Sequence, residues 1–232
     1  MRAHFPLYLK LPDQNQQALI ARMKVFLAEK NFEGCYGFEI TEEIRVMIAA
    51  QACLLLIGNK DREYSKLKSI LVYPRHYHAT SERVSENGIV TVSEQTVLGQ
   101  SWEQGLVSLS WESTKQGAVN MKDGRNVVIH EFAHQLDQED GIANGLPVLR
   151  SKCRYAAWKC VLGKEYTRLQ DRINKGRKTI MDAYGATHPA EFFAVASECF
   201  FEKPVQLKKH RPELYQQLEI FYGQDPVHYH TS

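Results

Sequence analysis

The sequence predicts an α+β fold that is mostly helical and carries a small mixed sheet. Apolar residues recur at helical spacing after Pro12, after Thr41 and through much of the C-terminal half. Shorter apolar runs at 68–73 and 105–111, bounded by Pro or Gly, have the length of strands. No internal repeat, low-complexity tract or clear linker divides the 232 residues. We therefore expect a single domain over the whole chain.

The composition is that of a globular protein without a strong electrostatic field. The formal net charge is +2, which gives no case for binding nucleic acid or an anionic membrane. The longest apolar stretch, 44–57, is interrupted by Arg45 and Gln51 and is too short to span a bilayer. We therefore expect no direct contact with nucleic acid and no insertion into a membrane.

The cysteines indicate a reducing compartment. There are five, widely spaced and without a Cys-x-x-Cys pair: Cys35, Cys53, Cys153, Cys160 and Cys199. Because four of the five lie in apolar or helical contexts, buried free thiols are expected rather than disulfides. The first residues also lack the continuous apolar core of a secretory signal. These features favour the cytoplasm.

Two helices are expected in the N-terminal quarter. The first begins with Asp13 as its N-cap. Thr41 is expected to cap the second, with Glu42 and Glu43 in the first turn, where the helix dipole favours acidic side chains. Because 44–57 is apolar on nearly all sides, this second helix is expected in the core.

Three short segments bounded by Gly or Pro are expected to be strands: 68–73, 88–92 and 105–111, the last of which alternates apolar and polar residues over part of its length. The polar stretch 74–87 is expected to be a connection. It holds His76 and His78, whose side chains can bind metals. Solvated or substrate-side histidines are favoured, because no further ligand lies nearby in the sequence. The segment 117–124 is expected to be a loop.

The strongest functional signal is His130-Glu131-x-x-His134, within an apolar segment over 124–137 that is expected to be helical. In a helix the two histidines are one turn apart and share a face. Two neutral imidazoles at this spacing can bind one Zn²⁺, with Glu131 placed to take a proton from water. Buried polar groups need partners, which a metal ion supplies. The core helix over 44–57 is expected beneath this site.

A catalytic zinc ion requires three protein ligands and an open position. The downstream candidates have oxygen or imidazole donors: Asp137, Asp140, Asp182, His188, Glu191 and Glu198. Asp137 shares a face with the two histidines but lies too close along the helix axis to complete a tetrahedron. We expect it instead to accept a hydrogen bond from a histidine N–H.

Glu191 and Glu198 are the strongest candidates, and spacing does not separate them. Seven residues apart, they share one face of a helix that begins near Pro189, and about 10.5 Å along the axis separates them, so only one can reach the metal. Glu191 would lie at the third helical position behind a His188 N-cap, where Glu is a common capping residue. Glu198 lies among apolar residues and could be a buried structural acid or a partner of a histidine N–H.

The motif and two later blocks resemble the Mlc titration factor A family. The resemblance is carried by the segments 130–137, 182–184 and 189–201 and extends from the helix after Pro12 to about Pro226. Members of this family are bacterial zinc metallopeptidases of the gluzincin type, and their catalytic fold is similar to that of the anthrax lethal factor protease domain. The resemblance therefore implies a zincin-like metalloprotease fold.

The same resemblance implies a role for each of five residues. His130, His134 and Glu191 would be the ligands of one zinc ion per chain. Glu131 would be the catalytic acid/base. Tyr184 matches a tyrosine that faces the reacting water or the oxyanion in this family.

Two activities of different class follow from the resemblance. One is hydrolysis of short peptides with an aminopeptidase-like preference, and the other is binding of the glucose repressor Mlc, which regulates phosphotransferase-system genes. The alternative is a non-enzymatic protein that titrates the repressor and retains the zinc site. The strand over 106–111 is a candidate edge along which an extended peptide substrate adds, unless it is an internal strand.

Overall fold

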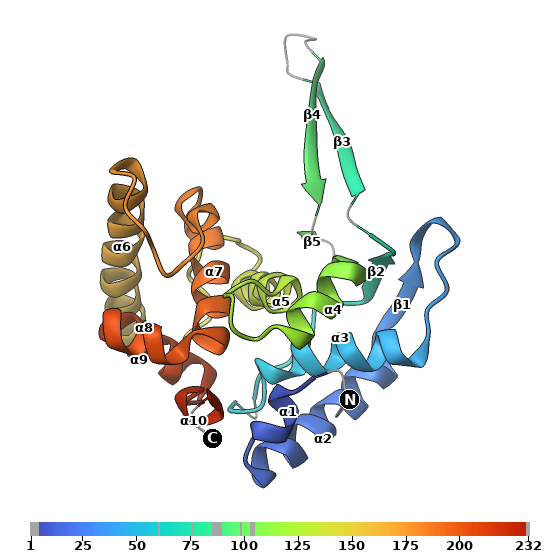
Figure 1. The fold of residues 1–232 in the computed structure, drawn as a ribbon, viewed down its shortest axis with the longest axis horizontal. Coiled ribbons are helices and arrows are strands. Elements are labelled where there is room, and N and C mark those ends of the chain that lie inside the picture. The colour runs from blue at the N-terminus through green and yellow to red at the C-terminus, as the bar shows by residue number, and fades with distance from the viewer. Residues whose placement is uncertain are drawn as a thin grey trace.

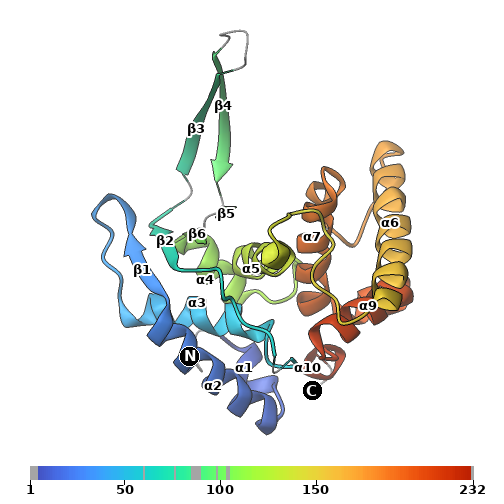
Figure 2. The same ribbon diagram turned by 180° about the vertical axis from the view of Figure 1, so that it is seen from behind.

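The computed structural model describes residues 5–59, 61–75, 77–84, 90–97, 99–102 and 105–230, and between 77 and 102 it describes the backbone alone. Helix α5 (Val127–Asp137) lies in the middle of the molecule (Figure 1). The N-terminal helices and the sheet are on one side of it, and the C-terminal helices are on the other. The view from behind shows the same arrangement (Figure 2).

Four helices belong to the N-terminal side: α1 (Leu7–Lys10), α2 (Asp13–Glu29), α3 (Glu42–Leu54) and α4 (Trp111–Val119). Thr41 caps α3 as expected, since its side chain accepts a hydrogen bond from the Ile44 N–H. The prediction that Asp13 caps α2 is wrong by one residue. The backbone carbonyl of Pro12 already accepts from Asn15, so Pro12 takes the cap position and Asp13 is helical.

The main sheet has four strands, β1 (Asn31–Gly34), β2 (Ser69–Tyr73), β5 (Gly99–Trp102) and β6 (Leu106–Ser110), in the order β1-β2-β6-β5. The first three strands in this order are parallel, and β5 is antiparallel to β6. This arrangement confirms the expected small mixed sheet. Because β6 pairs with a strand on each side, the prediction that 106–111 forms a sheet edge is wrong.

A second sheet consists of β3 (Tyr77–Val84) and β4 (Val90–Val97), which pair antiparallel and extend away from the body of the molecule (Figures 1 and 2). Most of the stretch 74–87 is therefore strand and not the polar connection that was expected. His76 lies outside the described residues, and so does the side chain of His78.

Helix α4 was not predicted, and its last three residues, 117–119, replace the start of the expected loop over 117–124. Its buried residues are small or polar, namely Thr114, Gly117 and Ala118. They give little hydrophobic periodicity, although Ser110 caps the helix by accepting from the Ser113 N–H.

The C-terminal half is helical: α6 (Lys152–Asn174), α7 (Pro189–Glu202), α8 (Pro204–His210), α9 (Pro212–Tyr222) and α10 (Val227–His230), with 3₁₀ turns η1 (Cys35–Gly37), η2 (Gln138–Asp140) and η3 (Ala183–Ala186) elsewhere in the chain. Helices α7, α8 and α9 each begin with a proline. Proline has the φ angle of the first helical position, and the N–H that it lacks would have no partner within the helix there. Within the described ranges, no helix has both the length and the apolar character needed to cross a bilayer.

All five cysteines lie in the described ranges and none forms a disulfide, which confirms the expected free thiols. Cys53 and Cys199 are buried. Cys153 and Cys160 are exposed, so the expectation of burial is wrong for these two, because they lie on the solvent side of α6.

The core contains one group of aromatic contacts on each side of the molecule. Phe132 has no exposed surface, and its ring centroid lies 4.8 Å from that of Tyr64 and 5.7 Å from that of Phe26. On the other side, Trp158 of α6 contacts the rings of Phe193 and Phe221 at centroid distances of 5.7 and 5.2 Å. Aromatic contacts therefore fix α2 and α5 on one side, and α6, α7 and α9 on the other.

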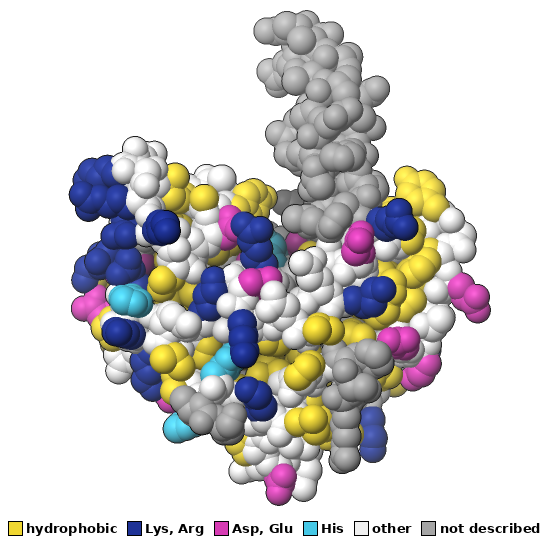
Figure 3. Space-filling model, viewed as in Figure 1, with side chains coloured by type: hydrophobic (Ala, Val, Ile, Leu, Met, Phe, Trp, Pro, Cys, Tyr) yellow, Lys and Arg dark blue, Asp and Glu magenta, His cyan; other side chains and the backbone are white. Residues whose placement is uncertain are grey.

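Charge is not spread evenly over the face shown in Figure 3. Lys and Arg side chains gather over the C-terminal end of α6, where Arg172, Lys175, Arg177 and Lys178 follow one another closely in the chain. Elsewhere on this face, basic and acidic side chains are interspersed. A net charge near zero thus describes the average of the surface and not each part of it.

Candidate metal centre

The start of α5 is fixed by a buried amide pair. Asn126 is the N-cap, and its side chain accepts from the Ile129 N–H at 3.0 Å. Its amide nitrogen donates to Gln51 of α3 at 3.0 Å. Gln51 has no exposed surface. The core helix α3 therefore lies beneath α5, as expected, and sets where the His-Glu-x-x-His turn begins.

Three side chains from two helices meet at one point. His130 Nε2 lies 3.2 Å from His134 Nε2, one turn away on α5. Glu191 of α7 places Oε2 3.0 Å from His130 Nε2 and 3.3 Å from His134 Nε2. These donor atoms lie within 4.8 Å of one another and could hold a metal ion. Two ligand atoms at Zn²⁺ bond lengths and a tetrahedral angle are about 3.3 Å apart, so the spacing fits such an ion.

Glu198 orients one of these imidazoles from behind. Its Oε2 lies 3.0 Å from His130 Nδ1, and its Oε1 accepts from the Asn126 N–H at 2.7 Å. A carboxylate beside Nδ1 favours the tautomer that carries its proton there, which leaves the Nε2 lone pair facing His134 and Glu191. Glu198 thus makes the histidine N–H contact that was one of the alternatives for it.

The carboxylates change the proton affinities in this cluster. Burial alone lowers the pKa of His130, but Glu198 and Glu191 outweigh burial and raise it well above its usual value. Burial would raise the pKa of Glu191, yet the two imidazoles hold it far below its usual range. The cluster therefore favours positive charge at the point where the three side chains meet.

Glu131 has a buried carboxylate group that interacts electrostatically with this cluster. The residue is 4% exposed, and within the described residues its Oε2 has no hydrogen-bond partner. Burial raises the pKa of this carboxyl group. A buried oxygen without a partner is unfavourable unless it serves another purpose, such as accepting a proton from a bound molecule.

Tyr184 lies near His130 on the 3₁₀ turn η3. The residue is 54% exposed, and its ring centroid lies 6.1 Å from that of His130. Asp182 fixes the turn, because it accepts from the Tyr184 N–H at 2.9 Å and forms an ion pair with Arg125 at 2.6 Å. Arg125 directly precedes the N-cap of α5, so the ion pair ties η3 to the start of α5.

The other candidates for a third ligand lie in structural roles. His188 caps α7, as expected, by accepting from the Ala190 N–H. Asp140 accepts from the Ile142 N–H within its own turn. The expectation that Asp137 accepts from a histidine is wrong. Its Oδ2 accepts from the Gly145 N–H at 2.8 Å, because the loop after α5 turns back over the helix end.

Comparison with known proteins agrees with this geometry. A family model described as glucose-regulated metallo-peptidase M90 matches residues 1–223. The proteins named Mlc titration factor A from Cronobacter sakazakii and Serratia proteamaculans are 34% and 35% identical to this chain over 225 residues. Each alignment covers 96% of this chain, with 84% and 85% of the relatives. The chain belongs to the M90 family. This result confirms the resemblance seen in the sequence.

An uncharacterized protein from Synechocystis sp. is also similar, at 40% identity over 224 residues, which cover 96% of this chain and 81% of the relative. M90 is a family of metallo-peptidases, so membership implies a metal ion. The group of two histidines and one glutamate fits that requirement, since its donor atoms converge in the described structure.

Four residues of this centre were not predicted from the sequence: Asn126, Gln51, Arg125 and Glu202. Asn126 could have been found, because an Asn directly before an apolar helical run is a common N-cap. Gln51 is an isolated amide in an apolar helix, which indicates a buried polar partner. Nothing local marks Arg125 or Glu202. Glu202 accepts from the Gly124 and Arg125 N–H groups at 2.8 and 2.9 Å, a contact between distant segments.

Proposed function

We propose that this chain is a zinc-dependent metallopeptidase of the gluzincin type, with a zincin-like fold, that hydrolyses short peptides with an aminopeptidase-like preference. The observation that carries the proposal is the convergence of His130, His134 and Glu191 beside a buried Glu131 oxygen without a partner among the described residues. In this proposal the first three bind one Zn²⁺, and Glu131 and Tyr184 are the catalytic residues.

Each protein group then has a distinct task. The zinc ion, when bound, supplies Lewis acidity to water and to a substrate carbonyl. Glu131 takes the proton of the attacking water and later gives it to the leaving amine. The Tyr184 hydroxyl donates a hydrogen bond to the carbonyl oxygen as negative charge develops there. Glu198 does not react but fixes the orientation of His130.

The test is to separate metal binding from chemistry. Purified protein should contain about one zinc per chain, and His130→Ala should lose it. Glu131→Gln should retain zinc, while turnover of short chromogenic peptides falls about 100-fold or more because the general base is gone. Wild-type turnover in Glu131→Gln would exclude Glu131 as the base. Activity that survives complete metal removal would exclude the metallopeptidase.

We also infer a second function, binding of the glucose repressor Mlc in the cytoplasm. The names of the relatives from Cronobacter and Serratia support it, and the five free thiols are compatible with a reducing compartment. Glu131→Gln keeps the fold and the metal ligands, so it should still capture the repressor from a lysate. Capture without any peptidase activity in the wild type would favour the non-enzymatic alternative, and no capture would leave the peptidase alone.

A further inference from the structure

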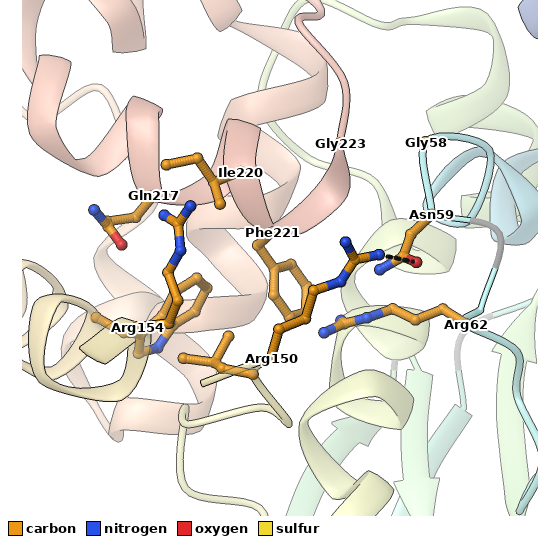
Figure 4. A pocket seen from close by; sticks show the side chains of 11 residues that line it. Gly58, Asn59, Arg62, Arg150, Arg154, Gln217, Ile220, Phe221 and Gly223 are labelled. Carbon is orange, nitrogen blue, oxygen red and sulfur yellow. Dashed lines mark hydrogen bonds between the residues drawn. The ribbon is translucent and has the colours of Figure 1, made fainter. Parts of the chain in front are cut away.

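A second site lies away from the metal centre. A pocket of about 160 Å³ lies between the segment after α3, the first turns of α6 with the residues before them, and α9 (Figure 4). The side chains that matter for its chemistry are Arg62, Arg150, Arg154, Trp158, Gln217 and Phe221. The lining shares no residue with the cluster of His130, His134 and Glu191.

Three guanidinium groups line this pocket, and among the described residues that line it there is no Asp or Glu. Arg150 donates to Asn59 at 3.1 Å and lies 3.5 Å from Asp61, whose side chain is 88% exposed and contributes little. For the guanidinium of Arg154, no hydrogen bond or ion pair is found within the described chain. The pocket therefore carries a net positive charge, which Asp61 and Glu139 balance only in part.

Arg62 is the most constrained of the three. One of its nitrogens donates to the Val148 carbonyl at 2.5 Å, while Nη1 is buried without a hydrogen-bond partner in the described part of the chain. Burial lowers the pKa of Arg62, Glu139 opposes that shift, and the nearby Arg150 adds to it. An anion placed between Arg62 and Arg150 would relieve the repulsion between the two guanidinium groups.

The pocket also offers an apolar wall. The Arg62 guanidinium stacks 3.8 Å from the centroid of the Phe221 ring, and Trp158 closes the wall beside it. Figure 4 shows Arg154 and Gln217 on one side of Phe221, and Arg62 and the head group of Arg150 on the other. A cavity of about 150 Å³ accommodates benzene, so this space suits a ring-sized body with a charged group attached.

We propose that this pocket binds a small organic anion, in which a carboxylate or phosphate group contacts Arg62 and Arg150 and a ring-sized apolar body lies against Phe221. A guanidinium presents paired N–H donors whose spacing matches both kinds of oxyanion. Gln217 and Arg154 then face the far end of the ligand and can donate to a second polar group. The site is independent of the proposed peptidase activity.

The test is calorimetric titration of the full-length protein with benzoate, phenyl phosphate and inorganic phosphate at constant ionic strength. We expect saturable binding of one phenyl probe per chain, tighter than that of inorganic phosphate because only the phenyl probes bury a ring. The tighter of benzoate and phenyl phosphate identifies the anionic group. If no probe binds saturably to the wild-type protein, the proposal is wrong.

Variants assign the binding to the pocket. Arg150→Gln should weaken it about tenfold or more, the effect of losing a charge-assisted hydrogen bond, and Arg154→Gln should weaken it less. Arg177→Gln removes the same charge from an exposed residue outside the lining and should leave affinity unchanged. A carboxylate probe can also bind a metal ion, so each variant must contain the same amount of zinc as the wild-type protein. If Arg150→Gln and Arg177→Gln weaken probe binding equally, the affinity depends only on the net charge of the protein, and the proposal is wrong.

Discussion

At the residue scale, two glutamates contact His130, each at a different ring nitrogen. Glu191 faces His130 Nε2 and Glu198 faces His130 Nδ1, each at 3.0 Å. Only Glu191 also lies close to His134, at 3.3 Å. The geometry thus favours Glu191 as the third ligand and Glu198 as the residue that holds the first ligand in place.

This division leads to opposite results for two alanine variants. Glu191→Ala should lose zinc and peptidase activity together, because it removes a ligand. Glu198→Ala should keep measurable zinc, with affinity about 10–100-fold lower, because a ligand loses its orienting partner. Competition with a metal indicator measures both. Stoichiometric zinc in Glu191→Ala, together with loss of zinc in Glu198→Ala, would reverse the two roles.

Glu202 gives a second prediction at this scale, for stability against pH. Burial, and then the carboxylates of Asp123 and Glu198, raise its pKa from 4.5 to about 9. The folded protein therefore holds this proton more tightly than the unfolded chain does. Its contribution to stability is complete below about pH 4.5 and is lost as the pH rises towards 9.

Glu202→Gln imitates the protonated side chain and can still accept from the Gly124 and Arg125 N–H groups. Between pH 5 and pH 9, roughly the window between the pKa values of Glu202 in the unfolded and folded states, we expect the melting temperature of this variant to fall less than that of the wild type. Thermal unfolding monitored by circular dichroism measures this difference. The exposed Glu33→Gln should follow the wild-type profile. Parallel profiles for Glu202→Gln and wild type would show that Glu202 is ionised in the fold.

At the element scale, the end of α5 and the start of α7 meet at Gly145. Its N–H donates to Asp137, the last residue of α5, and it has a positive φ of 74°. A Cβ at this position would lie 2.4 Å from the backbone oxygen of Pro189, the first residue of α7. The close approach of these backbones helps to place Glu191, two residues later, opposite the histidines.

Gly145→Ala should therefore disturb both stability and metal binding. The left-handed backbone alone costs roughly 1–2 kcal/mol for a residue with a Cβ, and the contact with Pro189 requires α7 to shift. Gly176→Ala is a matched control, since Gly176 has a φ of 62° but open space around its Cβ position. Denaturant unfolding and zinc titration should show destabilisation in both variants and weaker zinc in Gly145→Ala alone. Equal zinc affinity in the two variants would mean that this contact does not position α7.

The sequence predicts the elements that carry the site better than the elements around them. Helix α5 has strong apolar periodicity, and α7 begins at the sequence His188-Pro189, so both were expected nearly in place. Helix α4 buries small residues and was not predicted. The strands β3 and β5 depend on pairing with other strands, which a local pattern does not show.

The same distinction holds within the candidate site. His130 and His134 are four residues apart on one helix, so their proximity is a local property that spacing predicts. Glu191 is distant in sequence, and spacing alone left it equal to Glu198 until family resemblance favoured it. The contacts of Gln51 with Asn126 and of Arg125 with Asp182 arise only from packing between helices and turns, and no pattern announces them.

At the scale of the whole molecule, the centre joins the two sides of the fold. Helix α5 packs on the N-terminal side through Phe132 and Tyr64, while α7 packs on the C-terminal side through Phe193 and Trp158. The proposed ligands come from both helices. A metal ion held by His130, His134 and Glu191 would therefore link the two sides across the 56 residues, 135–190, that separate the last two ligands.

Zinc should consequently stabilise the whole fold. A ligand that binds only the folded state adds RT ln(1 + [L]/Kd), about 4 kcal/mol at 1,000 times Kd, and binding of zinc by the unfolded chain would reduce this value. Metal-free protein should melt at a lower temperature than the zinc-loaded protein, and added zinc should restore the melting temperature in a concentration-dependent way. Glu131→Gln should show the full shift, because it keeps all three ligands. Glu191→Ala should show almost none, because it lacks the ligand from α7. A full zinc-dependent shift in Glu191→Ala would mean that the ion binds α5 without linking the two sides of the molecule.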